Sequence, residues 1–181
     1  TAKAHYDFAW VLAIGDDAKR AIAVCDAALA LAKVVNDPVH LGYVLCLRAY
    51  YYYRFSQIDE ALAALAAATQ IFEPLGHLKG LSRVEERLAP AYAENGNYWK
   101  SLVHDKRALA LFEALGFAIK IPKGHQGVAC RYILLGAYDL ARWHFQQAIA
   151  LDERVGNQGG IMGSLGGLAE IEFLTGNYVE A

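Results

Sequence analysis

The sequence predicts an all-α fold, a solenoid built from antiparallel helix pairs. The first observation is a near-repetition every 40 residues, in which alanine recurs on two sets of positions: Ala9, Ala49, Ala89, Ala129 and Ala169, and Ala28, Ala68, Ala108 and Ala148. The second is that glycine triplets keep the same step, as Gly96-Asn97-Tyr98, Gly136-Ala137-Tyr138 and Gly176-Asn177-Tyr178. A fixed period of this size is typical of stacked repeats, each of which buries its apolar face against its neighbours.

Each 40-residue unit has the hydrophobic period of two helices. Between Tyr98 and Leu115 the apolar or small residues recur at three- and four-residue steps, while charged residues take the other side. Gly96 provides the tight turn before this helix. Alanine at the registered positions indicates where facing helices approach most closely, because a larger side chain would separate the backbones. The pattern predicts helices at about 2–14, 17–34, 39–54, 58–73, 79–94, 98–114, 123–135, 138–155 and 159–175, and a tenth starting at Tyr178.

Composition favours one repeat domain, residues 1–181, which we expect to be part of a longer protein. The chain has 181 residues, of which 56% are hydrophobic and 20% charged, enough for a long apolar core. The net charge of -2, without any basic run, disfavours nucleic acid and anionic membranes as partners. No apolar stretch approaches the roughly 20 residues that span a bilayer. Cys25, Cys46 and Cys130 form no C-x-x-C pair, so we expect buried thiols and a cytoplasmic location.

Catalytic and metal-binding patterns are weak. The histidines never pair at i, i+4 and adjoin no H-E-x-x-H motif, so we interpret them as surface or cap residues: His5, His40, His77, His104, His125 and His144. The glycine-rich stretch from Gly156 to Gly167 lacks the lysine of a phosphate-binding loop. Within it, Gly159, Gly163 and Gly167 would share the closely packed face of a helix of low stability. We therefore expect no enzymatic activity, no cofactor and no metal ion.

The residues resemble the tetratricopeptide repeat (TPR) family. Its pattern of leucine-small-x-x-tyrosine, glycine-x-tyrosine and alanine-x-x-x-aromatic is followed by Leu88-Ala89-x-x-Tyr92 and Gly96-x-Tyr98, and by Val128-Ala129-x-x-Tyr132, Gly136-x-Tyr138, Ala141 and Phe145. The units exceed the usual length of about 34 residues, so they resemble the long repeats of bacterial signalling proteins such as maltose-regulator-like activators and diguanylate cyclases. The family implies a right-handed superhelix whose concave wall is lined by the first helix of each pair.

The resemblance also implies where a ligand would bind. The inward positions of the first helices carry aromatic and basic residues in the N-terminal half, and these are our groove-binding candidates: Tyr6, Trp10, Tyr43, Tyr50, Tyr53, Arg54, Arg83 and Arg87. The other inward positions are Glu86, Lys123, Gln126 and Cys130. Aromatic and arginine side chains are frequent anchors of recognition surfaces. The alternative is that Tyr50 and Tyr53 pack against the adjoining helix with their hydroxyls in water, while Tyr52 takes the core position.

Three functions follow from this interpretation. The first, which we favour, is a non-enzymatic module of a regulatory protein that binds a protein or peptide segment in the concave groove. The second is a sensor for a sugar-like small ligand, and the third is a regulatory or dimerisation region of a larger enzyme such as a diguanylate cyclase.

We further expect Ile171, Phe173 and Leu174 to be exposed at the C-terminal end and to self-associate or fray. Pro90 predicts a kink in a groove-facing helix.

Overall fold

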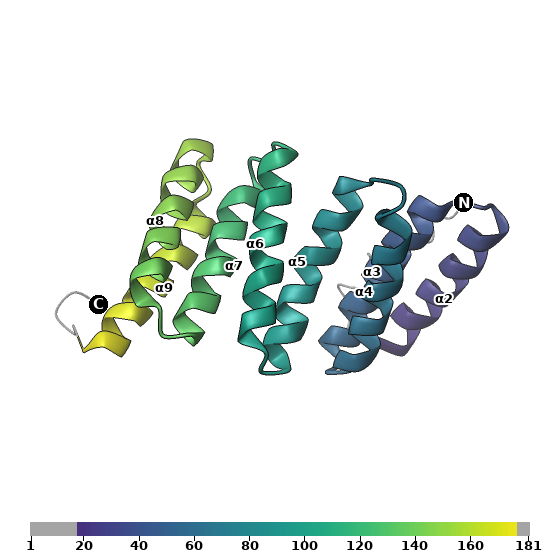
Figure 1. Ribbon diagram of the computed structural model, residues 1–181, viewed down its shortest axis with the longest axis horizontal. Helices are drawn as coiled ribbons and strands as arrows, with labels where there is room; N and C mark the ends of the chain where they lie inside the picture. Colours follow the sequence, from purple (N-terminus) through teal and green to yellow (C-terminus); the bar gives the residue numbers. More distant parts are fainter. Residues whose placement is uncertain (1–17, 177–181) are drawn as a thin grey trace. The chain divides into compact units, whose positions relative to one another are not determined.

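The computed structural model describes residues 18–176, and within this range the chain forms eight α-helices and no strand (Figure 1). The helices are α2 (Ala18–Val34), α3 (Pro38–Arg54), α4 (Ile58–Phe72), α5 (Leu78–Glu94), α6 (Tyr98–Ala114), α7 (Lys120–Leu134), α8 (Tyr138–Val155) and α9 (Gln158–Thr175). They divide into two compact units, one ending at Asn95 and one beginning at Gly96. The helices expected at 2–14 and from Tyr178 lie outside the described residues.

The turns between helices recur at a fixed step. Positive backbone φ occurs every 20 residues, at Asn36, Ser56, Gly76, Gly96, Gly116, Gly136, Gly156 and Gly176. Glycine adopts this conformation freely, whereas a residue with a Cβ atom pays roughly 1 kcal/mol for it. Gly96 and Gly136 therefore lie in turns, as the sequence predicts, and Asn36 and Ser56 hold the same backbone conformation without being glycine.

The residue after the turn caps the next helix in several of the repeats. Four such side chains accept a hydrogen bond from the amide three residues later: Asp37 from His40, His77 from Gly80, Asn97 from Lys100 and Asn157 from Gly160. Each bond satisfies one of the amides that a helix leaves without a partner in its first turn. The fixed spacing of turn and cap sets the helix boundaries along the chain.

The predicted boundaries agree with the structure to within one residue, except at α7. This helix begins at Lys120, three residues before the predicted start at 123. The sequence gives no cap signal at this helix start, because the N-cap residue Ile119 makes no side-chain hydrogen bond. Pro122 lies in the first turn. Proline is tolerated in the first turn of a helix, where its missing N–H has no intrahelical partner to lose.

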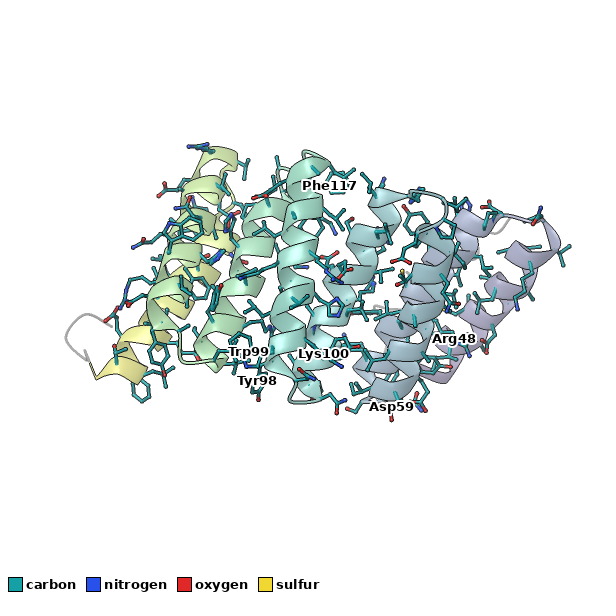
Figure 2. The ribbon with its side chains drawn as sticks, viewed as in Figure 1. Arg48, Asp59, Tyr98, Trp99, Lys100 and Phe117 are labelled. Carbon is teal, nitrogen blue, oxygen red and sulfur yellow. The ribbon has the colours of Figure 1, made fainter. Side chains whose placement is uncertain are left out.

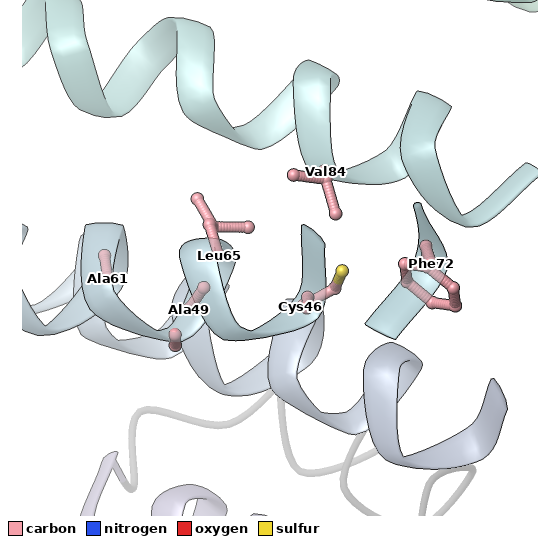
Figure 3. Packing of buried hydrophobic residues seen from close by; sticks show 8 residues of the cluster. Cys46, Ala49, Ala61, Leu65, Phe72 and Val84 are labelled. Atoms are coloured by element: carbon pink, nitrogen blue, oxygen red, sulfur yellow. The ribbon is translucent and has the colours of Figure 1, made fainter. Parts of the chain in front are cut away.

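The core of the first unit lies between α3, α4 and α5 and combines small residues with a few large ones (Figure 3). The ring of Phe72 on α4 is fully buried and occupies the space beside two glycines. A Cβ atom on either Gly42 or Gly80 would lie 2.5 Å from a ring carbon of Phe72. These glycines therefore let the ring lie directly against the backbones of α3 and α5.

The cysteines divide into two buried thiols and an exposed one. Cys25 and Cys46 are fully buried, as predicted. Burial raises the pKa of both thiols to about 12, so they stay protonated and unreactive. Cys130 is exposed, so the prediction of burial was wrong for this residue.

The core of the second unit lies between α7, α8 and α9 and centres on Phe145. A Cβ atom on Gly167 would lie 2.2 Å from this ring, so Gly167 does allow a close approach. The prediction of close packing was wrong for Gly159 and Gly163, where no neighbouring side chain lies nearer than 3.8 Å to such a Cβ atom. The separate prediction that Ile171 is exposed was also wrong, because this residue is fully buried in the same core.

A buried carboxylate replaces an aromatic ring at the end of α8. Phe72, Phe112 and Asp152 are spaced 40 residues apart, and at most 1% of each is exposed. The Phe72 ring stacks on His77, with ring centres 5.2 Å apart. At the matching positions, Oδ1 of Asp152 accepts a hydrogen bond from Nδ2 of Asn157 at 2.8 Å. The other carboxylate oxygen of Asp152 has no hydrogen-bond partner within the described part of the chain.

Replacing Ser56 with glycine should stabilise the protein. Ser56 is exposed and has φ of 57°, so the substitution removes backbone strain without removing a packed side chain. We expect a gain of about 0.5–1 kcal/mol in the free energy of unfolding, measured by urea denaturation. The reverse change at the matching turn, Gly136→Ser, should cost a similar amount. A loss of stability in Ser56→Gly would contradict the strain argument.

Replacing Asp152 with phenylalanine should also stabilise the protein. Gly160 lies against Asp152 as Gly80 lies against Phe72, so the site is expected to accept the ring. The change removes a buried oxygen that lacks a partner and adds apolar burial, so we expect a gain of about 1–3 kcal/mol in urea melts. Asp152→Asn keeps the shape and should gain less. A melt in which Asp152→Phe is less stable than the parent would show that the two sites differ in shape.

Candidate ligand-binding face on α3 and α5

Five of the predicted groove residues come together on two neighbouring helices of the first unit. Helices α3 and α5 contact each other, and we call the cluster formed by Tyr43, Tyr50, Arg54, Arg83 and Arg87 the α3/α5 face. Tyr6 and Trp10 lie outside the described residues. Tyr53 packs instead against the core cluster between α3 and α4.

Two arginines of α5 lie over two tyrosine rings of α3. The guanidinium carbon of Arg83 is 5.3 Å from the ring centre of Tyr43, and that of Arg87 is 5.1 Å from the ring centre of Tyr50. Tyr43 and Arg83 occupy the same position in successive first helices, 40 residues apart, so the repeat itself sets them side by side. The negative ring face attracts the guanidinium with roughly 0.5–2 kcal/mol, depending on how far water is excluded.

Tyr43 is held in place by its other neighbours. Its ring centre is 5.3 Å from that of Phe72 and 5.7 Å from that of His77, which it meets edge-on. Nδ1 of His77 accepts the hydrogen bond from the Gly80 amide at 2.9 Å, so it carries no proton and caps α5. The same histidine therefore starts helix α5 and fixes the tyrosine on which Arg83 rests.

Tyr50 is shared by two arginines. Its hydroxyl accepts a hydrogen bond from Nη1 of Arg54 at 3.4 Å, one helical turn further along α3. Its ring lies beneath Arg87 and meets the Tyr51 ring edge-on at 5.7 Å. Tyr50 thereby brings Arg54 and Arg87 to one place, although they come from different helices.

Tyr51 and Tyr52, which lie between Tyr50 and Tyr53 in the sequence, have structural roles. Tyr51 is 3% exposed and lies in the core between α2 and α3, although Tyr52 was predicted at the core position. Tyr52 is partly buried, and the guanidinium carbon of Arg48 lies 5.1 Å from its ring centre. Arg48 also forms an ion pair with Asp26 of α2 at 3.4 Å. Sequence reasoning missed Arg48, although it stands where Leu88 and Val128 stand in later repeats.

The inward positions predicted on α7 form no comparable cluster. Nε2 of Gln126 donates to the Gly160 carbonyl at 2.8 Å and to Oγ of Ser164 at 2.9 Å, so it ties α7 to α9. Lys123 and Cys130 are exposed. The polar contacts of Gln126 are structural, and the candidate face is confined to the first unit.

A second polar cluster lies between α7 and α8. The prediction that all histidines are surface or cap residues was wrong for His125, which is 8% exposed. Its Nδ1 atom is 2.9 Å from Nδ1 of His144, and Trp143 and Tyr132 pack around the pair. One ring must donate and the other accept, so the contact requires at least one histidine to be neutral.

The surroundings of this pair lower its affinity for protons. Burial lowers the pKa of His125, although the nearby Glu113 opposes the change. Burial, His125 and Lys106 together lower the pKa of His144 to about 4. The pair is therefore neutral at pH 7 and provides no positive charge to a ligand.

A partly buried ion pair joins α6 to α7. Nε of Arg131 donates to Oδ2 of Asp105 at 3.1 Å. Burial raises the pKa of Asp105 to about 6, although Arg131 opposes the change.

Among the described residues, no three His, Cys, Asp or Glu side chains are placed to hold a metal ion. Within the same range, no helix is both long and apolar enough to cross a membrane.

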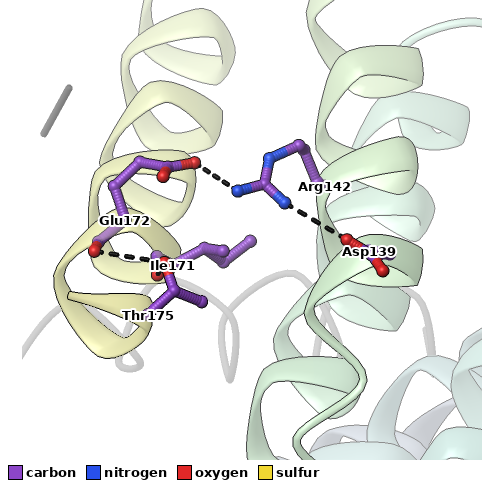
Figure 4. Close-up of polar contacts among 5 residues, drawn as sticks. All are labelled: Asp139, Arg142, Ile171, Glu172 and Thr175. Carbon is purple, nitrogen blue, oxygen red and sulfur yellow. Dashed lines mark hydrogen bonds and ion pairs between the residues drawn. The ribbon is translucent and has the colours of Figure 1, made fainter. Parts of the chain in front are cut away.

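An ion-pair cluster joins the first turn of α8 to the end of α9 (Figure 4). Arg142 pairs with Asp139 at 3.5 Å and with Glu172 of α9. Asp139 and Arg142 border an open pocket that is also lined by Tyr138 and Thr175. The guanidinium of this pocket lies between two carboxylates, so its charge is compensated within the protein.

Solved structures identify the fold. A Signal Transduction ATPase with Numerous Domains (STAND) protein with a tetratricopeptide repeat sensor, from Pyrococcus horikoshii, is similar with a TM-score of 0.91 and 16% identity, over 99% of this chain and 27% of that one. The fold is a TPR-like helical-repeat solenoid. A Podosopora anserina putative kinesin light chain with TPR-like repeats is similar with a TM-score of 0.78 and 15% identity, over 98% and 88% of the two chains.

A further similar structure contains a bound factor. A Rap protein complexed with Competence and Sporulation Factor has a TM-score of 0.75 and 21% identity, over 98% of this chain and 49% of that one. No protein-family model matches the chain, and no curated protein sequence matches it. At these identities the likeness shows the fold alone, and the chain spans about a quarter of the STAND protein.

The histidine pair should make stability depend on pH. Because the pKa of His144 is lowered in the folded state, the unfolded chain binds the proton first, and stability falls as pH decreases from about 6.5 to 4. The raised pKa of Asp105 acts in the opposite direction between about 6 and 3.8. In urea melts, we expect wild type to lose about 1–3 kcal/mol relative to His144→Gln between pH 7 and pH 4, since Asp105 is common to both.

The Asp105→Asn variant is the control for the carboxyl of Asp105, whose effect on stability is opposite to that of His144. It should show a steeper loss of stability towards pH 4 than wild type, because the carboxyl that gains a proton in the folded state is gone. A difference between wild type and His144→Gln that stays constant from pH 7 to pH 4 would contradict the histidine assignment.

Proposed function

We propose that this chain is a non-enzymatic recognition scaffold of a regulatory protein, with long repeats of the bacterial signalling type, and that it binds a protein or peptide segment through the α3/α5 face. The observation that carries the proposal is the pair of arginine–tyrosine contacts between successive first helices. Arginine and tyrosine dominate the energetics of recognition surfaces because they combine contact area with directed hydrogen bonds. The concave groove of the TPR architecture would present these helices to an extended segment.

The similar structures support the same class of function. One carries a TPR sensor in a signal-transduction ATPase, and another is a Rap protein in complex with Competence and Sporulation Factor. These are properties of those proteins, and they motivate the test below.

A sugar-like ligand receives less support from the geometry. A sugar stacks on an open aromatic face, whereas Arg83 and Arg87 lie over the rings of Tyr43 and Tyr50. Phe72 and His77 also pack against the ring of Tyr43, which restricts access further. The face therefore offers guanidinium donors more readily than bare rings.

The proposal is tested by selecting peptides from a displayed random library on the wild-type chain. The selected peptides should bind Arg83→Ala/Arg87→Ala at least tenfold more weakly, measured by fluorescence anisotropy. A matched control is Lys100→Ala/Arg107→Ala on α6, which removes the same charge elsewhere and should leave binding unchanged (Figure 2 labels Lys100). Circular dichroism and urea melts would check that both variants fold.

Two outcomes would contradict the proposal. In the first, the selected peptides bind the α5 variant as tightly as wild type. In the second, no peptide is enriched while a panel of sugars raises the melting temperature by several degrees, which would favour the small-ligand alternative.

A further inference from the structure

One asparagine of the chain is followed directly by glycine. The asparagines are Asn36, Asn95, Asn97, Asn157 and Asn177, and among them only Asn95 precedes a glycine, Gly96. Asparagine is one of the thermally labile residues, because the main-chain nitrogen of the next residue can attack its side-chain carbonyl carbon. A glycine in the next position favours this attack, since it has no Cβ atom to obstruct the approach to its nitrogen. The sequence thus marks one asparagine as chemically reactive.

The structure leaves this pair open. Asn95 is the C-cap residue of α5, and both Asn95 and Gly96 are exposed. Gly96 has a φ of 73°, and a Cβ atom built on it would meet no atom within 4 Å. The Cβ side of Gly96 is therefore free of packed neighbours, so the reaction does not require the core to open.

The hydrogen bonds at the end of α5 constrain Asn95 only weakly. Its N–H donates to the Ala91 carbonyl at 3.3 Å, which is longer than the usual backbone hydrogen bond. Attack requires rotation about the Cα–C bond of Asn95, whose ψ is 10°, so that the side-chain carbon and the Gly96 nitrogen come to the same side. This rotation disturbs only the last turn of the helix, and helix ends open at little cost in free energy.

Two other asparagines have their side chains bound in helix caps. Oδ1 of Asn97 accepts a hydrogen bond from the Lys100 amide at 3.1 Å, and Oδ1 of Asn157 accepts one from the Gly160 amide at 3.2 Å. Neither side chain can turn towards the next main-chain nitrogen without losing its cap bond. Both are also followed by residues larger than glycine, so they serve as internal references.

We infer that Asn95-Gly96 is a modification site, at which Asn95 deamidates without an enzyme. The Gly96 amide loses its proton to solvent, its nitrogen forms a bond to Cγ of Asn95, and the bond from Cγ to Nδ2 breaks. Nδ2 takes up a proton from solvent and leaves as ammonia, so a succinimide ring remains. This inference does not rest on the proposed function.

Water then opens the ring in one of two ways. Breaking the bond between Cγ and the Gly96 nitrogen leaves aspartate, whereas breaking the bond between the main-chain carbonyl carbon and that nitrogen leaves isoaspartate. In both cases one water molecule is consumed and one ammonia molecule is released, and nothing is oxidised or reduced.

Both products change the turn after α5. Each carries a carboxylate near the C-terminus of the helix, where the macrodipole disfavours negative charge. Isoaspartate also adds one atom to the main chain, because the chain then runs through Cβ and Cγ of the former side chain. Gly96 is one of the positive-φ residues that recur every 20 positions, so isoaspartate disturbs this regular turn. We expect the deamidated protein to unfold at a lower urea concentration than the intact protein.

The experiment is an incubation of the full chain at pH 8 and, in parallel, at pH 5, followed by digestion and mass spectrometry of the asparagine-containing peptides. Fragmentation assigns the modified residue, and chromatography separates isoaspartate from aspartate. We expect Asn95 to deamidate at least tenfold faster than Asn97 or Asn157. The reaction should be faster at pH 8 than at pH 5, because the attacking amide must lose its proton.

A matched variant links the modification to stability. Asn95→Gln keeps an exposed amide at the same place, but ring closure would need a larger and less favourable ring, so this variant should stay unmodified. After incubation at pH 8, wild type should unfold at a lower urea concentration than before, while Asn95→Gln should be unchanged. An unchanged melt of a deamidated wild-type sample would contradict the effect on the turn.

The same incubation in guanidinium chloride gives the rate of the unfolded chain. If Asn95 reacts there but stays intact in the folded chain, the end of α5 protects it and the inference is wrong. Equal rates at Asn95 and Asn157 in the folded chain would also overturn it, because the glycine would then confer no reactivity. Neither result bears on peptide binding, which is tested at the α3/α5 face.

Discussion

The structure depends on a constant distance along the chain between one turn and the next. Positive-φ residues occur every 20 positions from Asn36 to Gly176, so the described helices have nearly the same length, between 15 and 18 residues. This regularity allows a residue to contact its counterpart in the next repeat, as Tyr43 contacts Arg83. It also explains why small residues recur at fixed positions, since each repeat has the same points of close approach.

The fixed positions make substitutions between repeats informative. The position filled by Phe72 and Phe112 is Asp152 in the next repeat, and its partner changes with it, from His77 to Asn157. An aromatic stack is thereby replaced by a polar pair that joins the same two elements. Together with Gln126 and Arg142, this pair gives α9 a largely polar attachment, with Ser164 and Ile171 as its only fully buried residues among those described. Polar contacts are directional and weakened by water, so we expect α9 to be the most easily loosened of the described helices.

The sequence predicted the helices and turns well because these follow from local chemistry. Glycine tolerates positive φ, and cap residues satisfy free amides, so Gly96 and Asn97 mark the start of α6 without knowledge of the fold. The start of α7 was missed because its N-cap residue, Ile119, has no side chain that could cap the helix. Burial was harder to predict: Tyr51 and Tyr52 are adjacent, and a small rotation of the helix decides which of them enters the core.

The polar clusters were not predicted, because they depend on how the helices pack against one another. His125 and His144 are 19 residues apart on different helices, and only the angle between α7 and α8 brings their Nδ1 atoms together. The buried state of Asp152 was visible only by comparison with Phe72 and Phe112 in the same register. The residues of the α3/α5 face were predicted together because they belong to two successive first helices, and their role in binding stays a prediction. What the sequence left open was their arrangement, with each arginine resting on a tyrosine.

That arrangement links the fold to the proposed function. In the second unit, Arg142 of α8 pairs with Glu172 of α9, and this ion pair joins two helices of the fold. On the α3/α5 face, Arg83 and Arg87 lie over the rings of Tyr43 and Tyr50, so contacts between arginine and tyrosine join two successive first helices. A tyrosine ring attracts the guanidinium through its quadrupole, and arginine and tyrosine are the side chains that recognition surfaces use most. The same contacts therefore stabilise the packing of α5 on α3 and carry our proposal that this face binds a partner.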